Sequence, residues 1–190
     1  MFVTAHAVRG LVRRAACWIL AVAWLAAAAH AQTARFDEHE VKAVFLFNFV
    51  QFVEWPTTAF RDPRAPVVIG VLGEDPFGRT LDEIVRGEHV RNRDLVVQRY
   101  RRLEDVGACH ILFVSSSEAG RYGDILAALQ HRPTLTVGDM DGFASRGGMV
   151  RFLTERSRVR FEINTAAVKA AGLTISSTLL RSATIVGGPR

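Results

Sequence analysis

The sequence predicts an α/β fold: a single three-layer domain in which helices flank a mixed β-sheet of about six strands. Continuous apolar runs, such as residues 67–72 and 110–115, are typical of strands that are buried on both faces. Segments with helix caps and helical spacing alternate with these runs, and such alternation is typical of layered α/β domains. Residues 32–190 are numerous enough to build one domain with a hydrophobic core.

Residues 1–31 are predicted to be a secretory signal peptide that is cleaved near Ala31. The features of such a peptide follow in order: a positive region (Arg9, Arg13, Arg14), an apolar run (15–28) and the small-x-small site Ala29-His30-Ala31. The run is too short to cross a bilayer of about 30 Å. We therefore expect export to a bacterial periplasm. Cleavage leaves 21 basic and 19 acidic residues, and this near-balance of charge argues against a nucleic-acid partner.

Residues 38–54 are predicted to form the first helix, because this apolar run is too long for a strand and polar residues recur within it. On a helical wheel, Val41, Phe45, Phe49 and Phe52 share one stripe. Phe47 falls among the polar residues instead. Either the helix is buried nearly all round, or it presents an aromatic patch to a partner. Trp55-Pro56 ends the helix, since a residue before proline disfavours the helical conformation.

The strands predicted after this helix are residues 67–72, 95–100, 110–115, 135–137, 149–153 and 159–163. The last of these alternates between apolar and polar residues, so we expect a half-buried strand that is antiparallel or at an edge.

The helices predicted between and after the strands are placed by their capping residues. They run from Asp75-Pro76 to Arg86, from Ser116 or Ser117 to His131, from Asn164 to a stop at Gly172, and over 176–186.

Cys109 is the one cysteine outside the signal peptide, so an internal disulfide is excluded for the mature chain. Three states are open to it: a buried inert thiol, an intermolecular bridge or a reactive site. Burial is favoured, because Cys109 stands at the start of an apolar run.

The sequence does not indicate catalysis, a metal site or a cofactor. Ser115 and Ser117, with His110 and Asp139, invite a hydrolase interpretation, but the G-x-S-x-G elbow is missing and helix capping accounts for the serines. The histidines are scattered and lack metal-ligand spacing. A small-molecule pocket near Gly73, Ser115 and Asp139, at the carboxyl ends of the strands, stays open as an alternative.

Several sequence motifs resemble those of the YfiR family of periplasmic proteins and follow one another in the same order along the chain. They are Lys42-Ala43-x-Phe45-Leu46-x-Asn48-Phe49-x-x-Phe52-x-x-Trp55-Pro56, Gly70-Val71-Leu72-Gly73-x-Asp75-Pro76-Phe77-Gly78, Cys109-His110-Ile111-Leu112-Phe113-Val114-Ser115-x-Ser117-Glu118, Leu135-Thr136-Val137-Gly138-Asp139, Phe143-Ala144-x-x-Gly147-Gly148-Met149-Val150-x-Phe152 and Arg160-Phe161-Glu162-Ile163-Asn164. The last of these leads to Ala171-Gly172-Leu173-x-Ile175-Ser176-Ser177-x-Leu179-Leu180, and the resemblance covers residues 41–186.

This resemblance implies a periplasmic homodimer that binds the periplasmic domain of an inner-membrane diguanylate cyclase, or of a similar sensor kinase. Binding would repress the cyclase, and an outer-membrane lipoprotein would relieve the repression. The protein would then control cyclic-di-GMP signalling, biofilm formation and motility. The alternative is a periplasmic small-molecule-binding sensor that feeds a histidine kinase or a transport system.

Phe47, Trp55, Pro56 and Phe60 are the residues predicted to bind the partner, because aromatic anchors dominate protein interfaces. For Trp55, a core position beneath the first strand is an equal alternative.

Overall fold

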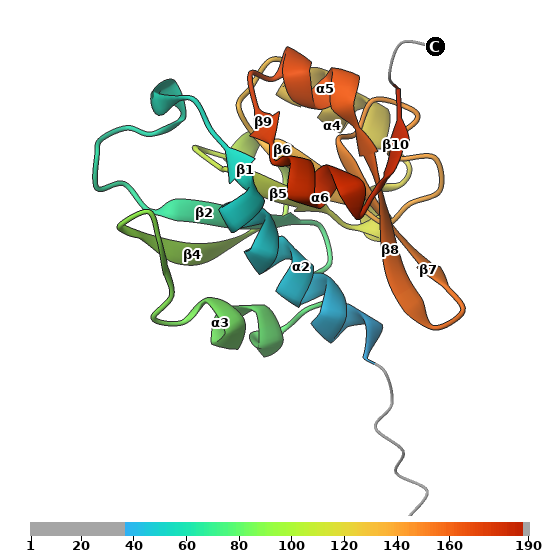
Figure 1. Ribbon diagram of the computed structural model, residues 1–190, viewed down its shortest axis with the longest axis horizontal. Helices are drawn as coiled ribbons and strands as arrows, with labels where there is room; N and C mark the ends of the chain where they lie inside the picture. The colour runs from blue at the N-terminus through green and yellow to red at the C-terminus, as the bar shows by residue number, and fades with distance from the viewer. Residues whose placement is uncertain (1–36, 188–190) are drawn as a thin grey trace, which may run out of the picture. The chain divides into compact units, whose positions relative to one another are not determined.

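An eight-stranded mixed sheet forms the centre of the computed structural model, which describes residues 37–187 (Figure 1). The strands lie in the order β10 (Thr184–Val186), β8 (Arg158–Asn164), β7 (Val150–Glu155), β6 (Leu135–Gly138), β5 (Ile111–Val114), β2 (Val67–Leu72), β4 (Arg93–Tyr100) and β3 (His89–Val90). Neighbouring strands are parallel except for the β7–β8 and β3–β4 pairs. The predicted α/β class and mixed sheet are confirmed, with two short edge strands, β3 and β10, that the sequence did not predict.

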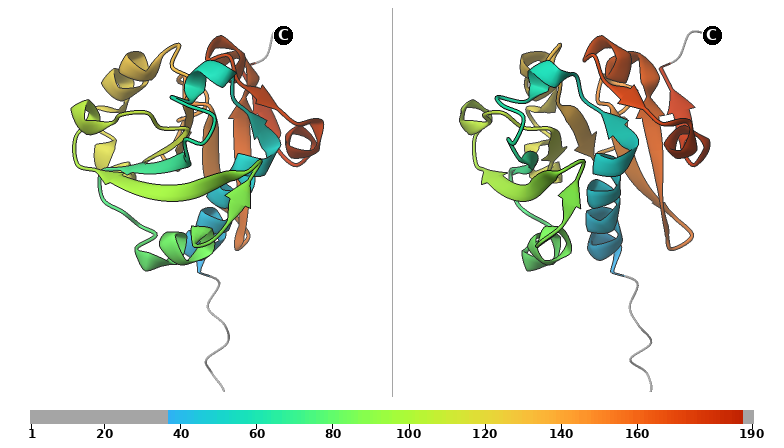
Figure 2. Two further views of the ribbon diagram at one scale, coloured as in Figure 1. Left: turned by 90° about the vertical axis from the view of Figure 1, so that its left-hand side faces the viewer. Right: turned by 60° about the vertical axis from the view of Figure 1, so that its left-hand side comes forward.

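Helices form a layer on each face of this sheet, as Figures 1 and 2 show. On one face, α2 (Glu38–Phe52) and α3 (Arg79–Val85) contribute to the larger core. On the other face, α4 (Tyr122–Leu129) packs Ile125 and Leu129 into a second core with Leu112 and Val114. The α5 (Thr165–Ala170) and α6 (Ser177–Arg181) helices add to the larger core. A separate pair, β1 (Val53–Glu54) and β9 (Thr174–Ile175), joins the end of α2 to the C-terminal region.

Four phenylalanines form a cluster of ring contacts in the larger core. Phe49 on α2 is fully buried, stacks on Phe152 of β7 at 5.8 Å between ring centroids, and meets Phe161 of β8 edge-on at 5.7 Å. Phe45, one helical turn earlier, meets Phe161 edge-on at 5.4 Å. The stripe that Phe45 and Phe49 share on the helical wheel therefore faces the core.

The helix after β2 starts later than predicted. Asp75 does not cap it: one carboxylate oxygen accepts the N–H of Phe77 at 2.8 Å, and the other pairs with Arg99 at 2.7 Å. Because Asp75 is engaged in this turn, α3 begins at Arg79.

The helix predicted from Ser116 or Ser117 is divided into two. Ser115 is the capping residue of a short 3₁₀ helix, η3 (Ser116–Glu118), and its hydroxyl accepts the N–H of Ser117 at 3.3 Å. The α-helix itself begins only at Tyr122.

Residues 176–186 form two elements, not one. Ser176 caps α6, and the β-branched run Thr184-Ile185-Val186 forms β10 beside β8. Branching at Cβ restricts the side chain in a helix and favours strands, which accounts for the switch. The cap at Asn164 and the stop at Gly172 are confirmed for α5.

Cys109 is buried in the second core, as expected. Its thiol donates to the carbonyl of Ile111 at 2.9 Å. Burial raises the pKa of the Cys109 thiol to about 12, so it stays protonated and unreactive at neutral pH. None of the helices described for residues 37–187 combines the length and the apolar character needed to span a membrane.

Candidate functional site

The predicted pocket residues Gly73, Ser115 and Asp139 lie together at the carboxyl edge of the sheet. Each immediately follows its strand, and Leu72, Val114 and Gly138 are aligned in register. Internal contacts occupy this edge. A Cβ on Gly73 would collide with the Ser117 hydroxyl, which itself accepts the N–H of Glu74 at 2.9 Å.

Asp139 is engaged by Lys42, a lysine of α2 that is only 3% exposed. The Lys42 ammonium lies 2.8 Å from the Asp139 carboxylate and 2.7 Å from that of Glu38. Burial lowers the pKa of Lys42, but the hydrogen bonds to Asp139 and Glu38 outweigh it and leave the pKa above its ordinary value. Lys42 is therefore a buried cation that ties α2 to the end of β6.

The positions of His110 and Ser115 also argue against a hydrolase. His110 precedes β5 and Ser115 follows it, so the two are separated by the length of the strand, about 16 Å at 3.3 Å per residue. A general base must lie within hydrogen-bond reach of its nucleophile. Among residues 37–187, no three His, Cys, Asp or Glu side chains come together as a metal site requires.

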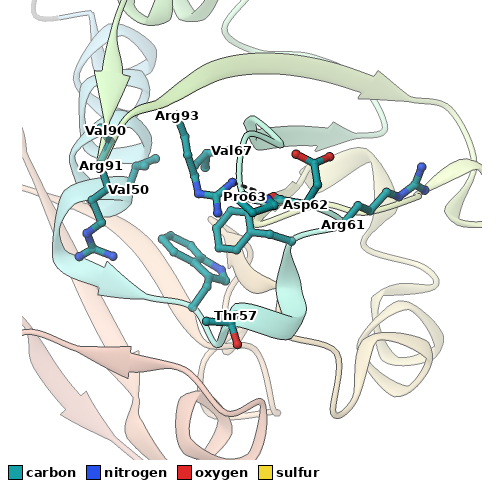
Figure 3. A pocket seen from close by; sticks show the side chains of 11 residues that line it. Val50, Thr57, Arg61, Asp62, Pro63, Val67, Val90, Arg91 and Arg93 are labelled. Atoms are coloured by element: carbon teal, nitrogen blue, oxygen red, sulfur yellow. Dashed lines mark hydrogen bonds between the residues drawn. The ribbon is translucent and has the colours of Figure 1, made fainter.

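An open cavity of about 460 Å³ lies at the opposite, amino end of the strands, beside Val67 (Figure 3). One wall is the segment between β1 and β2, which contains the 3₁₀ helix η1 (Thr57–Ala59). The other wall is the turn that joins β3 to β4. We call it the aromatic–arginine cavity, after Trp55, Phe60, Arg91 and Arg93, which all line it.

Two of the four residues predicted to bind a partner, Trp55 and Phe60, line this cavity. Pro56 lies between them in the chain and precedes η1. Phe47 does not belong to the lining: it is half-buried and packs against the larger core from α2.

Trp55 and Phe60 are held in fixed orientations by His110 and Arg93. The indole N–H of Trp55 donates to the carbonyl of His110 at 3.1 Å. The Phe60 ring stacks on the His110 imidazole at 4.4 Å, and the Arg93 guanidinium carbon lies 3.7 Å from the centre of the same ring. Arg93 in turn donates to the carbonyl of Ala65 at 2.6 Å. The aromatic side chains are therefore preorganised.

His110 is a neutral, buried side chain beneath the cavity. Its Nδ1 accepts the backbone N–H of Val68 at 3.0 Å, so the proton is on Nε2, which has no hydrogen-bond partner among the described residues. Burial and the nearby charge of Arg93 lower the pKa of His110 to about 4, against a weaker opposing effect of the Ala59 carbonyl.

The lowered pKa of His110 predicts a loss of stability in mild acid. Between pH 6.5 and 4 the unfolded chain binds a proton at this position that the folded chain does not, so stability is complete above pH 6.5 and falls as the pH is lowered. We expect thermal denaturation of the wild type to show this fall already between pH 6.5 and 5, above the titration range of most carboxylates. His110→Asn, which keeps an acceptor for Val68 but does not titrate, should show a flatter profile; equal profiles would contradict the assignment.

Arg91 and Arg93 give the cavity a cationic rim. Arg91 and Asn92 form a two-residue turn in which both have positive φ, 52° and 61°, a conformation that non-glycine residues rarely adopt. The Arg91 guanidinium donates to the carbonyl of Val53 at 3.3 Å. Within the described part of the chain, neither Arg91 nor Arg93 forms an ion pair with a carboxylate.

Arg61 and Asp62, the other two charged residues that line the cavity, contribute less charge to its interior. Figure 3 shows the Arg61 side chain extending away from the cavity. The Asp62 carboxylate accepts the backbone N–H of Arg64 at 2.7 Å. The sequence did not predict the roles of Arg91, Arg93 or His110. Arg91 lies in the short connection between β3 and β4, and Arg93 is the first residue of β4; in the sequence, this arginine-rich stretch is typical of an ordinary solvated surface.

The fold is thus an α/β sheet whose carboxyl edge is occupied by internal contacts, with an open cavity lined by aromatic residues at the amino edge. A family model described as YfiR/HmsC-like (DUF4154) matches residues 39–184. The chain therefore belongs to the YfiR/HmsC-like family. This is a regulatory, non-catalytic family of periplasmic proteins linked to cyclic-di-GMP signalling, and membership implies interaction with the periplasmic domain of a membrane protein.

The other comparisons add little. No curated protein matches the chain. Among solved structures, the chain is similar to an ABC domain in complex with L-Trp from Streptococcus pneumonia, with 9% identity and a TM-score of 0.46. The match covers 63% of this chain and 55% of that one, so the chain spans about half the length of that structure.

Proposed function

We propose that this protein represses an inner-membrane diguanylate cyclase by binding its periplasmic domain through the aromatic–arginine cavity. The observation that supports this is a cavity lined by preorganised, half-buried aromatic side chains beside two arginines that form no ion pair among residues 37–187. Aromatic and arginine side chains are the residue types most enriched among the energetic anchors of protein interfaces. Repression follows if the protein binds the inactive state of the cyclase more tightly than the active one.

The homodimer and the relief of repression by an outer-membrane lipoprotein belong to the same proposal, as features that the resemblance implies. Export through a cleaved peptide at residues 1–31 also belongs to it; that segment lies outside the described residues.

Phe60→Ala is expected to remove repression. Deleting the gene should raise cellular cyclic-di-GMP, the wild-type gene should restore the low level, and Phe60→Ala should leave it high, because the ring that supports Arg93 in the cavity is lost. The measurement is cyclic-di-GMP by mass spectrometry, with exported protein quantified in parallel.

Phe47→Ala is the matched comparison, since Phe47 is also a half-buried phenylalanine but lies outside the cavity lining. If the Phe47→Ala protein represses the cyclase as fully as the wild-type protein does, the partner surface is confined to the cavity. Full repression by a normally exported Phe60→Ala protein would contradict the proposal.

A second candidate function is small-molecule sensing, with a histidine kinase or a transport system downstream. The observation that favours it is the cavity volume of about 460 Å³, which lies within the range of about 300–1,000 Å³ typical of small-ligand sites. A ligand present at 100 times its Kd would stabilise the protein by about 2.7 kcal/mol. A thermal-shift screen of metabolites, in which one compound stabilises the wild type but not Phe60→Ala, would favour this function.

A further inference from the structure

We infer that the part of the cyclase that enters the aromatic–arginine cavity is an acidic segment, which inserts an aromatic or aliphatic side chain and places a carboxylate against Arg91 and Arg93. This inference rests on the proposed function and specifies the chemistry of the partner. It commits to a protein segment as the occupant.

The interior of the cavity selects an apolar side chain. Its walls include the indole of Trp55 and the edge of the Phe60 ring, whose faces are covered by His110 and Arg93, together with the aliphatic side chains of Val67 and Val90. The polar atom of Trp55 is already satisfied by the His110 carbonyl, so the indole offers only its apolar surface. Burying an apolar side chain against such walls removes apolar surface from water, which favours the complex.

The rim selects a negative charge. Arg91 directs one hydrogen bond to Val53, and Arg93 uses a single nitrogen for the carbonyls of Asp62 and Ala65. The remaining N–H donors of both guanidiniums have no partner among residues 37–187. A guanidinium has five N–H donors in a planar fork that matches a carboxylate, so these two side chains are suited to an acidic residue.

The shape of the rim fits a protein segment. Exposed residues border the cavity on both sides: Thr57 and Pro63 on the segment before β2, and Arg91 in the turn before β4. A chain that lies across the opening would therefore contact both walls. The backbone of Arg91 is held in the left-handed region, so this guanidinium is presented from a conformation that few side chains adopt.

The β7–β8 hairpin supplies a matched control for Arg91. Its turn is formed by Arg156 and Ser157, which also have positive φ, 49° and 60°. Arg156 is exposed, as Arg91 is, and it lies toward the opposite edge of the sheet from the β3–β4 turn. The same charge reversal in the same kind of turn can therefore be made inside and outside the proposed contact.

The experiment begins with the photocrosslinking amino acid p-benzoylphenylalanine in place of Thr57 in the exported protein, in cells. We expect it to capture an inner-membrane diguanylate cyclase, and the crosslinked peptide to contain Asp or Glu next to an apolar residue. The periplasmic domain of that cyclase is then purified and titrated with wild type, Arg91→Glu, Arg91→Gln and Arg156→Glu. We expect Arg91→Glu to weaken binding at least 10-fold, Arg91→Gln less, and Arg156→Glu less than twofold.

The outcomes separate this inference from the function on which it rests. Capture of the cyclase, with a crosslinked peptide that lacks acidic residues or with equal effects of Arg91→Glu and Arg156→Glu, would overturn the acidic-segment inference and leave the repressor function standing. A folded, exported probe that captures no cyclase would overturn both. Thermal denaturation of each variant verifies that it is folded.

Discussion

Phe49→Ala is expected to lower the free energy of unfolding by about 3–5 kcal/mol, the range for removing a buried phenylalanine side chain. Phe49 is fully buried and contacts Phe152 and Phe161, which belong to two different strands. The cavity left by the ring cannot collapse easily, because its walls are fixed in the sheet. Since the total stability of a domain is about 5–15 kcal/mol, this loss is a large part of it.

Urea denaturation, with the midpoint and the slope both fitted, measures this change. Phe45→Ala is a suitable comparison, since Phe45 belongs to the same ring cluster but is only half-buried, and its loss should be smaller. A loss below about 1 kcal/mol for Phe49→Ala would be that of an ordinary surface substitution and would contradict its place at the centre of the core.

Lys42→Ala is expected to destabilise the protein by about 2–3 kcal/mol. Breaking a fully buried ion pair by removing one partner costs about 3–5 kcal/mol, because the other charge stays behind unpaired. The value here is lower because Glu38 is 37% exposed and can return to water, whereas Asp139 is only 20% exposed. The loss should therefore arise mainly from the stranded Asp139 carboxylate.

Two further variants test this explanation of the Lys42 effect. Lys42→Met keeps most of the side-chain volume and removes the charge, so it isolates the electrostatic part. Adding Asp139→Asn to Lys42→Met should recover stability, because the unpaired carboxylate is removed. If the double variant is as unstable as the sum of the two single variants, the two residues are not energetically coupled.

The longer helices and strands could be predicted because each has a local signal. The six predicted strands lie where apolar runs or strict alternation placed them, and Asn164 and Gly172 bound their helix as expected. One error arises where a side chain has a competing partner. Asp75 was expected to cap a helix, but Arg99, which is distant in sequence, draws its carboxylate into a different turn.

The candidate site could be predicted only in part, because its chemistry depends on contacts between distant segments. Trp55 and Phe60 stand out in the sequence as aromatic residues outside the core pattern. The cationic rim does not, since Arg91 and Arg93 meet them only through the β3–β4 turn. The burial of Lys42 is similarly hidden, because its partner Asp139 is 97 positions away.

The left-handed backbone of Arg91 sets stability and regulation against each other at one position. Glycine or asparagine is the residue that this turn would accept most readily, so random mutagenesis with selection for heat resistance alone would replace Arg91. Such a replacement would also delete a charge from the rim of the cavity. Under the acidic-segment inference, homologues that have glycine or asparagine at this position lack a charge of the rim and are the ones in which to look for a different partner.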